Sequence, residues 1–258
     1  MIVGLYTSAS GMLAEASRHE AIANNLANAS TTGFKQDTAV LRQQPTQVIH
    51  RMSDQMANFE AFTSDLAPAV GSRGMGTVVE SIAPNFRQGQ LMETGSRYDL
   101  ALSGEGFFIV QTARGRRYTR AGNFTMDGKG RLVTMSGDPV LSSTGAEIVA
   151  GDRKLEINKN GIIFLDGQEA GRLGTVVPEG QDSLVKEGES LYAPMAGARF
   201  KASEGMVFQG TLERSNVNPV LGMAEMLEAL RAYEMNQRAI IAQDETLGKL
   251  ISEVGRFG

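Results

Sequence analysis

Both ends of the chain carry a series of residues, mostly apolar, spaced alternately three and four apart. The N-terminal series consists of Ile2, Leu5, Ala9, Met12, Ala16, His19, Ala23 and Leu26. The C-terminal series consists of Met223, Met226, Leu230, Tyr233, Gln237, Ile240, Asp244, Leu247, Ile251 and Val254. A mean spacing of about 3.5 residues keeps one stripe of a helix facing a partner helix. The chain is therefore predicted to form two long helices, at about 2–27 and 219–254, that pair as a coiled-coil-like arm.

Local signals agree with these helix ends. Turn-forming residues occupy 28–33 after the first helix, and Gly33 can adopt the left-handed backbone found after many helices. Asn218 is a favourable N-cap, and Pro219 has the fixed φ preferred at a first helical position. Gly11 lies inside the first helix and should cost about 1 kcal/mol relative to alanine. Alone in water, this helix should be weakly helical.

The middle of the chain has a different pattern, with short alternating or apolar runs cut by turn residues. The runs are 78–82, 98–102, 107–112, 131–134, 155–157, 162–165 and 173–177. The turns are Asp127-Gly128, Gly137-Asp138-Pro139, Asn160-Gly161 and Asp166-Gly167, which can reach the positive φ that tight hairpins require. No helix-length periodic segment separates the runs, so an antiparallel sheet is favoured over a parallel one.

These patterns predict an α+β fold, mainly an antiparallel β body flanked by the two helices. We expect an N-terminal helix and loop at 1–33, a linker at 34–76, the β domain at 77–214 and the C-terminal helix at 215–258. The linker assignment follows from its mixed, polar and Gln-rich sequence, in which 52–62 could form a short helix.

Composition excludes several function classes. Lys and Arg total 25 against 29 Asp and Glu, giving a net charge of −4 without a basic tail, which argues against nucleic acid as a partner. No apolar run approaches the ~20 residues needed to span a bilayer, and the N-terminus has no pattern of a cleaved secretory peptide. The chain has no Cys, which removes disulfides, thiolate nucleophiles and Cys-ligated metals.

Motifs for catalysis or cofactor binding are weak. The two histidines, His19 and His50, lie near no nucleophile signature such as G-x-S-x-G. The Gly-rich segments 71–76 and 103–106 lack the strand and helix of a phosphate-binding loop, and 127–130 lacks the carboxylates of an EF-hand. The sequence therefore predicts no catalytic residue, no cofactor and no metal, although a carboxylate pair for glycoside hydrolysis needs no local motif.

Four arginines surround a predicted hairpin turn at Gly115. They are Arg114, Arg116, Arg117 and Arg120. Such a cluster is either a solvated loop or a contact patch for an acidic neighbour.

Three motifs resemble the bacterial flagellar rod and hook proteins. The N-terminal motif is NNLANASTTGFK at 24–35, and the C-terminal motif is LERSNVN at 212–218 followed by RAYE at 231–234. Between them, DLAL at 99–102, GFF at 106–108 and YTRAGNF at 118–124 resemble the β domain of the rod members. The opening residues 2–13 and the segment after Phe34 look more like the proximal-rod type or its Gram-positive relative than the distal-rod type.

The resemblance implies a structural subunit of the flagellar basal-body rod and not an enzyme. Members of this family are exported through the flagellar type III apparatus without a cleaved signal and lie outside the cytoplasmic membrane. Their terminal helices pack side by side in the inner tube, and their β domain forms an outer layer. The implied partners are other rod and hook subunits, copies of the chain itself and the export apparatus.

Assembly is accordingly expected to depend on helix-stripe and signature residues. The stripe residues are Leu5, Met12, His19, Leu26, Leu230, Tyr233, Gln237, Ile240, Asp244 and Leu247. The signature residues are Asn24, Asn25, Asn28, Gly33, Phe34, Ser215, Asn216, Val217 and Glu234. The asparagines and Ser215 are expected to cap or cross-link helix ends, and His19, Gln237 and Asp244 to set register. The alternatives are a secreted carbohydrate-active or cell-wall-binding β protein with dimerising helices, and an adhesin-like binding module.

Overall fold

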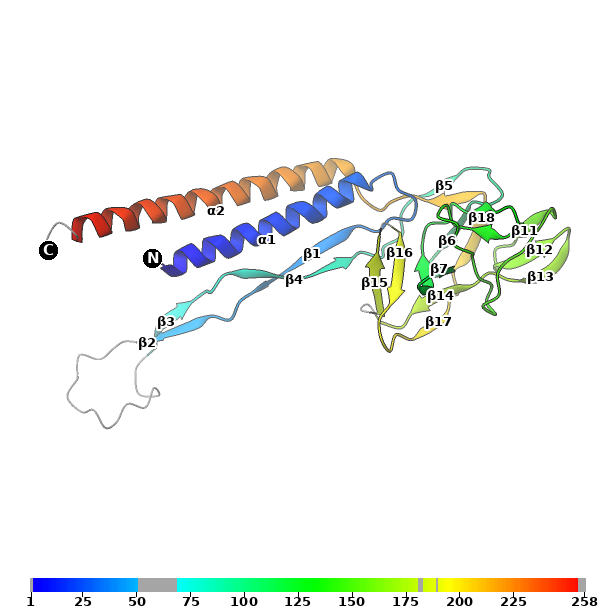
Figure 1. The fold of residues 1–258 in the computed structure, drawn as a ribbon, viewed down its shortest axis with the longest axis horizontal. Coiled ribbons are helices and arrows are strands. Elements are labelled where there is room, and N and C mark those ends of the chain that lie inside the picture. Colours follow the sequence, from blue (N-terminus) through cyan, green and yellow to red (C-terminus); the bar gives the residue numbers. More distant parts are fainter. Residues whose placement is uncertain (1, 51–68, 181–182, 189, 255–258) are drawn as a thin grey trace, which may run out of the picture. The chain divides into compact units, whose positions relative to one another are not determined.

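The computed structural model describes residues 2–50, 69–180, 183–188 and 190–254. Its described part divides into two compact units. Unit 1 comprises Met1–Ala23, Thr38–Ala83 and Met223–Gly258, and unit 2 comprises Asn24–Asp37 and Pro84–Gly222. The predicted α+β class is confirmed, because the chain forms a long N-terminal helix, then an antiparallel β body and then a long C-terminal helix (Figure 1).

The two helices have the bounds that the sequence predicted. Helix α1 is Ile2–Ala27 and helix α2 is Pro219–Val254. The carboxamide oxygen of Asn218 accepts hydrogen bonds from the amides of Val220 at 3.1 Å and Leu221 at 3.3 Å. Asn218 is therefore the N-cap of α2, which satisfies amides that have no partner within the helix.

Unit 1 contains most of both helices together with paired strands. Strand β1 (Asp37–Gln43) pairs with β4 (Thr77–Pro84), and β2 (Gln47–His50) pairs antiparallel with β3 (Ala69–Arg73). Helix α1 lies between α2 and the β1–β4 pair, as Figure 1 shows, and the amide of Thr77 donates to Ser10 Oγ.

Strands β1, β2 and β3 lie within 34–76, the segment expected to be a linker. These strands are largely exposed and bury no continuous face. The alternation of apolar and polar residues that reveals a half-buried strand is therefore weak in this segment. The short helix predicted at 52–62 lies outside the described residues.

Unit 2 is built from several antiparallel sheets. The largest has the order β15-β16-β8-β7-β14-β17. Its strands are β15 (Leu184–Glu187), β16 (Leu191–Pro194), β8 (Gly115–Thr119), β7 (Phe107–Thr112), β14 (Thr175–Pro178) and β17 (Phe200–Ala202). A second sheet joins β11 (Leu155–Ile157), β12 (Ile162–Leu165) and β13 (Gln168–Arg172). The remaining pairs are β9 (Thr125–Met126) with β10 (Leu132–Val133), β6 (Leu100–Ser103) with β18 (Met206–Gln209), and β5 (Leu91–Glu93) with β19 (Thr211–Glu213).

The turn predictions hold at most positions. Asp166 and Gly167 have φ of 52° and 80° and form the two-residue turn between β12 and β13. At Asp127-Gly128 the prediction is wrong, because the positive φ occurs at Gly130. The Asp127 carboxylate accepts the amides of Lys129 and Arg131, which stabilises a longer loop than a two-residue hairpin.

The core of unit 2 consists of two apolar clusters. Phe108 and Val110 of β7 belong to the larger cluster, which also includes Leu100 and Leu102 of β6. Phe107, the neighbour of Phe108, belongs to the smaller cluster. Successive residues of a strand point to opposite faces, so β7 contributes to both clusters. Each fully buried side chain of this size contributes about 1.5–3 kcal/mol.

Candidate functional site

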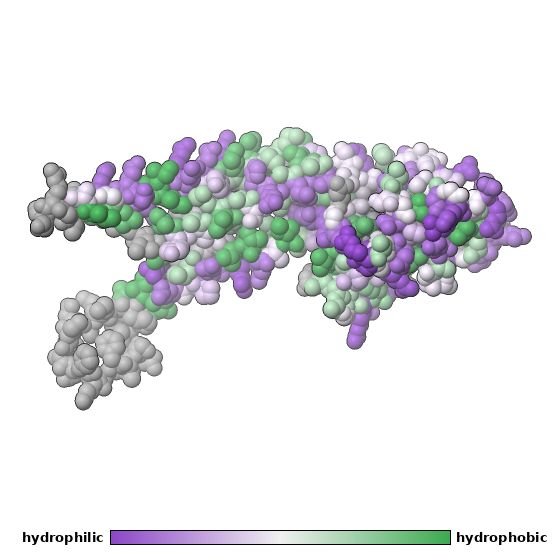
Figure 2. Space-filling view, viewed as in Figure 1, coloured by the Kyte–Doolittle hydropathy of each residue, from purple (hydrophilic) through white to green (hydrophobic). Residues whose placement is uncertain are grey.

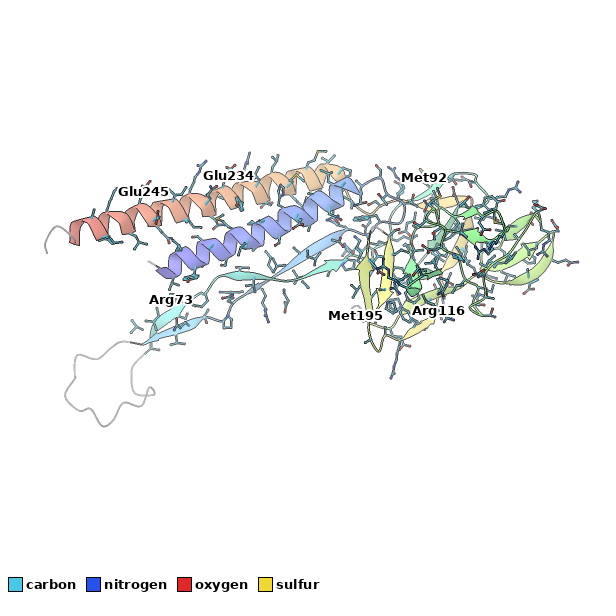
Figure 3. All side chains as sticks on the ribbon, in the orientation of Figure 1. Arg73, Met92, Arg116, Met195, Glu234 and Glu245 are labelled. Atoms are coloured by element: carbon cyan, nitrogen blue, oxygen red, sulfur yellow. The ribbon has the colours of Figure 1, made fainter. Side chains whose placement is uncertain are left out.

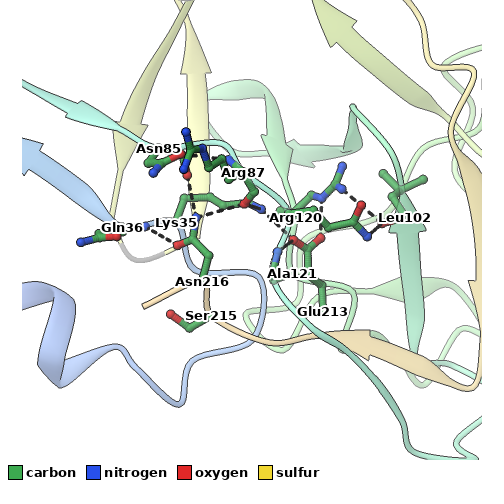
Figure 4. A network of polar contacts seen from close by, with 12 residues as sticks. Lys35, Gln36, Asn85, Arg87, Leu102, Arg120, Ala121, Glu213, Ser215 and Asn216 are labelled. Carbon is green, nitrogen blue, oxygen red and sulfur yellow. Dashed lines mark hydrogen bonds and ion pairs between the residues drawn. The ribbon is translucent and has the colours of Figure 1, made fainter. Parts of the chain in front are cut away.

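Three charged side chains meet inside unit 2, one from each of the three motifs. Lys35 comes from the N-terminal motif, Arg120 from the middle motif and Glu213 from the end of β19; their side chains are 1%, 4% and 1% exposed. Lys35 Nζ lies 2.7 Å from Glu213 Oε1, and Arg120 Nε lies 2.5 Å from Glu213 Oε2 (Figure 4). We call Lys35, Arg120 and Glu213 the charged triad.

The remaining polar atoms of the triad are also paired. Arg120 donates to the carbonyl oxygens of Leu102, Gly104 and Gly106. Lys35 Nζ donates to the carbonyl oxygen of Arg87 at 2.8 Å. Buried charges are tolerated when their hydrogen bonds are satisfied, whereas removing one member leaves an uncompensated charge that costs about 3–5 kcal/mol.

The triad is buried deeply enough to affect proton binding at Lys35. Burial lowers the pKa of Lys35 from its ordinary value, Glu213 opposes this shift, and the nearby Arg120 adds to it. The direction means that desolvation outweighs the attraction of Glu213. The triad is therefore a means of fixing segments in place more than a source of net electrostatic stability.

The carboxamide of Asn216 joins the C-terminal motif to the backbone at Gln36 and at residues 85–87. Its Oδ1 accepts the amide of Gln36 at 2.8 Å, and its Nδ2 donates to the carbonyl oxygens of Asn85 and Arg87 at 2.8 and 3.0 Å (Figure 4). The Gly33 amide also donates to the Glu213 carbonyl oxygen at 2.8 Å. The N-terminal and C-terminal motifs are thus held side by side.

Gly33 occupies a position where the backbone conformation and the available space both require glycine. Its φ is +67°, and a Cβ there would lie 2.4 Å from the amide nitrogen of Ala121. A left-handed φ costs other residues about 1–2 kcal/mol, and a backbone atom at that distance has to move. The predicted positive φ at Gly33 is confirmed, and the close approach to Ala121 adds a reason that the sequence did not reveal.

Further asparagines stabilise the end of α1. Asn25 and Asp37 exchange two hydrogen bonds of 2.7 Å through the Asn25 carboxamide and the Asp37 backbone. Asn28 donates to the carbonyl oxygen of Asn24 and accepts from Thr31. These are side-chain bonds of the predicted kind, and the part that they play in assembly stays a prediction.

Phe34, Ser215 and Val217 complete this region. Phe34 is fully buried, and the Lys186 ammonium lies 3.8 Å from the centroid of its ring. Lys186 also pairs with Asp37 at 2.7 Å. Ser215 Oγ accepts the amide of Val217, whose side chain is buried. Phe34 and Val217 are therefore packed within the chain.

The predicted stripe residues divide into two groups. The half-buried group consists of Leu5, Met12, His19, Leu26, Tyr233, Ile240 and Leu247. The exposed group consists of Leu230, Gln237 and Asp244, and the signature residue Glu234 is exposed as well. Glu234 can be located on α2 in Figure 3, together with Glu245. Leu230 is 43% exposed although it is a large apolar residue.

The arginine cluster around Gly115 finds its acidic partners within the chain. Arg114 and Arg117 both pair with Glu187, while Arg120 belongs to the charged triad. Arg116 is exposed and can be located in Figure 3. Three of the four arginines are therefore committed to contacts within unit 2 and do not form an open basic patch.

None of the helices among the described residues combines the length and apolar character needed to cross a membrane. Over the same described ranges, His, Asp and Glu side chains form no group of three or more arranged to hold a metal ion.

Comparison with protein families gives three matches along the chain. Residues 5–35 match the model described as flagella basal body rod protein, and 101–165 match the flagellar hook protein FlgE/F/G D1 domain. Residues 209–253 match the flagellar basal body rod FlgEFG protein C-terminal model. The charged triad takes Lys35, Arg120 and Glu213 from these three matched ranges, one from each.

Individual relatives are similar over nearly their whole length. The flagellar basal-body rod protein FlgF of Caulobacter vibrioides is 35% identical over 95% of this chain and 98% of its own. The flagellar hook-basal body complex protein FlhO of Bacillus subtilis is 31% identical over 100% of both chains. The flagellar basal-body rod protein FlgG of Bacillus subtilis is 31% identical over 98% of this chain and 99% of its own.

Proposed function

Because the chain belongs to the flagellar basal-body rod protein family, we propose that it is a structural subunit of the bacterial flagellar rod that assembles through its terminal helices. Its site of action is the flagellar basal body. Its partners are other rod and hook subunits and copies of itself. This role uses binding surfaces and needs no reacting group.

The observation that carries the assembly proposal is the apolar surface of unit 1. Met223, Leu230 and Ile251 of α2 are 55%, 43% and 72% exposed and are separated by multiples of seven residues. Tyr6 and Leu13 of α1, also seven apart, are exposed as well. Figure 2 shows apolar side chains along the visible surface of the helices. Patterned apolar residues at the surface are typical of interaction sites.

The predicted helix stripe supports a division of contacts. Met226, Tyr233, Ile240 and Leu247 repeat every seven residues and are half-buried in the single chain. The alternate stripe positions, at 223, 230, 237, 244 and 251, are exposed. In this proposal the first set belongs to a coiled-coil-like pair of α1 and α2, and the second set contacts helices of neighbouring subunits.

The joined motifs of unit 2 have a supporting role. Lys35 lies eight residues beyond the end of α1, and Glu213 lies six residues before the start of α2. Their ion pair holds the chain close to the ends of both helices at one place in unit 2. The charged triad therefore links the segment that follows α1 to the segment that precedes α2.

Several finer assignments rest on the resemblance. Export through the flagellar type III apparatus and the absence of enzymatic activity belong to the proposal. Membership of the proximal-rod type stays a prediction, because identities of 35% to FlgF and 31% to FlhO and FlgG are close. Nothing in the comparisons supports the carbohydrate-active or cell-wall-binding alternative.

The substitution Leu230→Asp tests the assembly role of the exposed stripe. It puts a charge at a position that assembly is proposed to desolvate, so rods and motility should be lost in cells that make only this variant. The β body should stay folded, as measured by circular dichroism of the purified chain. Met135→Asp is the matched control, because Met135 is an exposed methionine of unit 2. Normal rods with Leu230→Asp would refute the proposal.

A further inference from the structure

Helices α1 and α2 contact each other at layers one heptad apart. Gly4 faces Gln243, Gly11 faces Asn236, and Arg18 forms an ion pair of 3.8 Å with Glu228. Positions on α1 rise by seven while those on α2 fall by seven or eight, so the helices run antiparallel within unit 1. All three layers involve a polar side chain of α2.

The carboxamides fill the space that the glycines leave open. A Cβ on Gly4 would lie 2.9 Å from Gln243 Nε2, and a Cβ on Gly11 would lie 3.1 Å from Asn236 Nδ2. By contrast, a Cβ added to Gly248 of α2 would meet no atom within 4 Å. Glycine inside a helix costs about 1 kcal/mol, and close approach of a partner is a physical reason to retain it at these two positions of α1.

The two carboxamides tolerate displacement poorly. Asn236 Nδ2 donates to the Ala232 carbonyl oxygen at 3.0 Å, so turning it away from Gly11 breaks a hydrogen bond. Gln243 Oε1 is buried and has no hydrogen-bond partner in the described part of the chain. This oxygen would lie 3.0 Å from a Cβ on Gly4, so the carboxamide of Gln243 fits here because residue 4 has no side chain.

The apolar part of the stripe cannot by itself define how the helices align. Met226, Tyr233, Ile240 and Leu247 repeat every seven residues and would occupy equivalent places after a slip of one heptad. The glycine layers would not, because a slip that places Gln243 over Gly11 also places Asn236 at Arg18. The opposite slip leaves Gln243 without either glycine.

We propose that Asn236 and Gln243, each lying over a glycine of α1, fix the antiparallel register of the two terminal helices within the chain. Gln237 and Asp244, which the sequence pattern suggested for setting register, are exposed in the single chain. The residue before each of them makes the contact. This inference concerns pairing inside one molecule and does not depend on assembly into a rod.

Cross-linking of the purified full-length chain tests the register directly, because the chain has no Cys. Arg18→Cys with Glu228→Cys reports the native register, and Arg18→Cys with Met235→Cys reports a slip of one heptad. Glu228 and Met235 are both exposed, so a cysteine at either position is open to a short bis-maleimide, which links it to position 18 only when the two lie close together. We expect the native pair to link about tenfold more than the slipped pair, because the slip removes Asn236 from the space that Gly11 leaves open; tenfold corresponds to ~1.4 kcal/mol.

The same two cysteine pairs are then combined with alanine substitutions of the carboxamides that face the glycines. Asn236→Ala with Gln243→Ala should bring linking of the slipped pair to within about twofold of the native pair, whereas Gln237→Ala with Asp244→Ala should preserve the preference. Equal linking in the unsubstituted background would overturn the proposal. An unchanged preference after removal of both amides would overturn it as well.

A steric rescue provides a second readout. Gly11→Ala should lower the helix content of the chain on heating, and Asn236→Ala in the same chain should restore it by making room for the methyl group. Gly248→Ala, whose new methyl meets no neighbour, should instead raise helix stability. If Gly11→Ala behaved like Gly248→Ala, the close contact at Gly11 would not constrain the pairing.

Discussion

Unit 1 and unit 2 use apolar residues in opposite ways. In unit 2, Leu100 and Phe108 are completely buried within a shared cluster. In unit 1, Leu13 of α1 and Val70 of β3 are 71% and 65% exposed. Unit 2 thus contains its own core, whereas unit 1 leaves patterned apolar surface available for contacts outside the chain. The difference separates the part that folds within one chain from the part that is proposed to join chains.

The two units also differ in how fully their buried polar groups are hydrogen-bonded. The charged triad of unit 2 has partners for each of its three side chains. Among the described side chains, the buried polar atoms without a hydrogen-bond partner belong to Glu15, Arg73 and Gln243 of unit 1 and to Tyr192 of unit 2, although Glu15 forms an ion pair of 3.7 Å with Arg18. Burial raises the pKa of the Tyr192 hydroxyl, and the charges of Asp37 and Glu213 add to this shift. Unit 1 therefore carries most of the unsatisfied groups as well as the patterned apolar surface.

The largest test of this contrast is Glu213→Gln. It leaves Lys35 and Arg120 with no compensating charge inside unit 2, and we expect a loss of about 3–5 kcal/mol in the free energy of unfolding. Urea unfolding followed by circular dichroism measures this loss. Glu245→Gln on the exposed surface of α2 is the control and should change stability by less than about 0.5 kcal/mol. Equal effects would mean that the triad contributes no more than a surface charge.

A pair of leucine substitutions sharpens the comparison of apolar groups. Leu102→Ala removes a buried side chain of unit 2 and should cost about 2–5 kcal/mol. Leu13→Ala should change the stability of the purified chain by less than about 0.5 kcal/mol, yet reduce rod formation in cells. Thermal unfolding and motility measured on both variants separate the two roles. Destabilisation of the isolated chain by Leu13→Ala would show that Leu13 is part of a core.

The smallest expected effect is a dependence of stability on acid. Hydrogen bonds from the Arg131 amide and guanidinium hold the pKa of Asp127 below its ordinary value. A depressed pKa contributes stability above the unfolded pKa, and this contribution is lost as the pH falls through the folded pKa. Asp127→Asn should therefore be less stable than the unsubstituted chain near pH 7, and the difference should shrink below about pH 4. Melting curves at both pH values measure it; a constant difference would exclude titration of Asp127 as its source.

Local patterns predicted the elements well. The run 107–112 became β7 with the same bounds, and 155–157 and 162–165 became β11 and β12. Alternation and turn residues are local properties, so a single sequence displays them. Strand β1 was not predicted, because a largely exposed strand does not require alternating apolar and polar residues.

The charged triad was not predictable in the same way. Lys35 and Glu213 are 178 residues apart, and Arg120 and Glu213 are 93 apart. No spacing rule connects charges at such distances, and each charge alone resembles an ordinary surface residue. The motifs around them were visible, but the contact between the motifs exists only in the folded unit.

The sequence predicted the helix stripe, and the structure shows that alternate stripe residues of α2 are exposed in the single chain. Large residues such as Met223 and Leu230 are exposed in the single chain, whereas Ala229 is completely buried. Within one chain the close approach of helices favours small residues, and large apolar residues are left on the surface. A periodic pattern therefore identifies a helix more reliably than it identifies which partner covers each face.

The long sequence separation of Lys35 and Glu213 also determines when their ion pair can form as the chain is made. A chain that emerges from its N-terminus exposes Lys35 early, but Glu213 follows only after 178 further residues. Until then Lys35 has no ion-pair partner, and α2 has not yet appeared. Contacts between such distant positions close slowly because the intervening loop has to be ordered first. The ion pair between Lys35 and Glu213 therefore forms only after nearly the whole polypeptide is present.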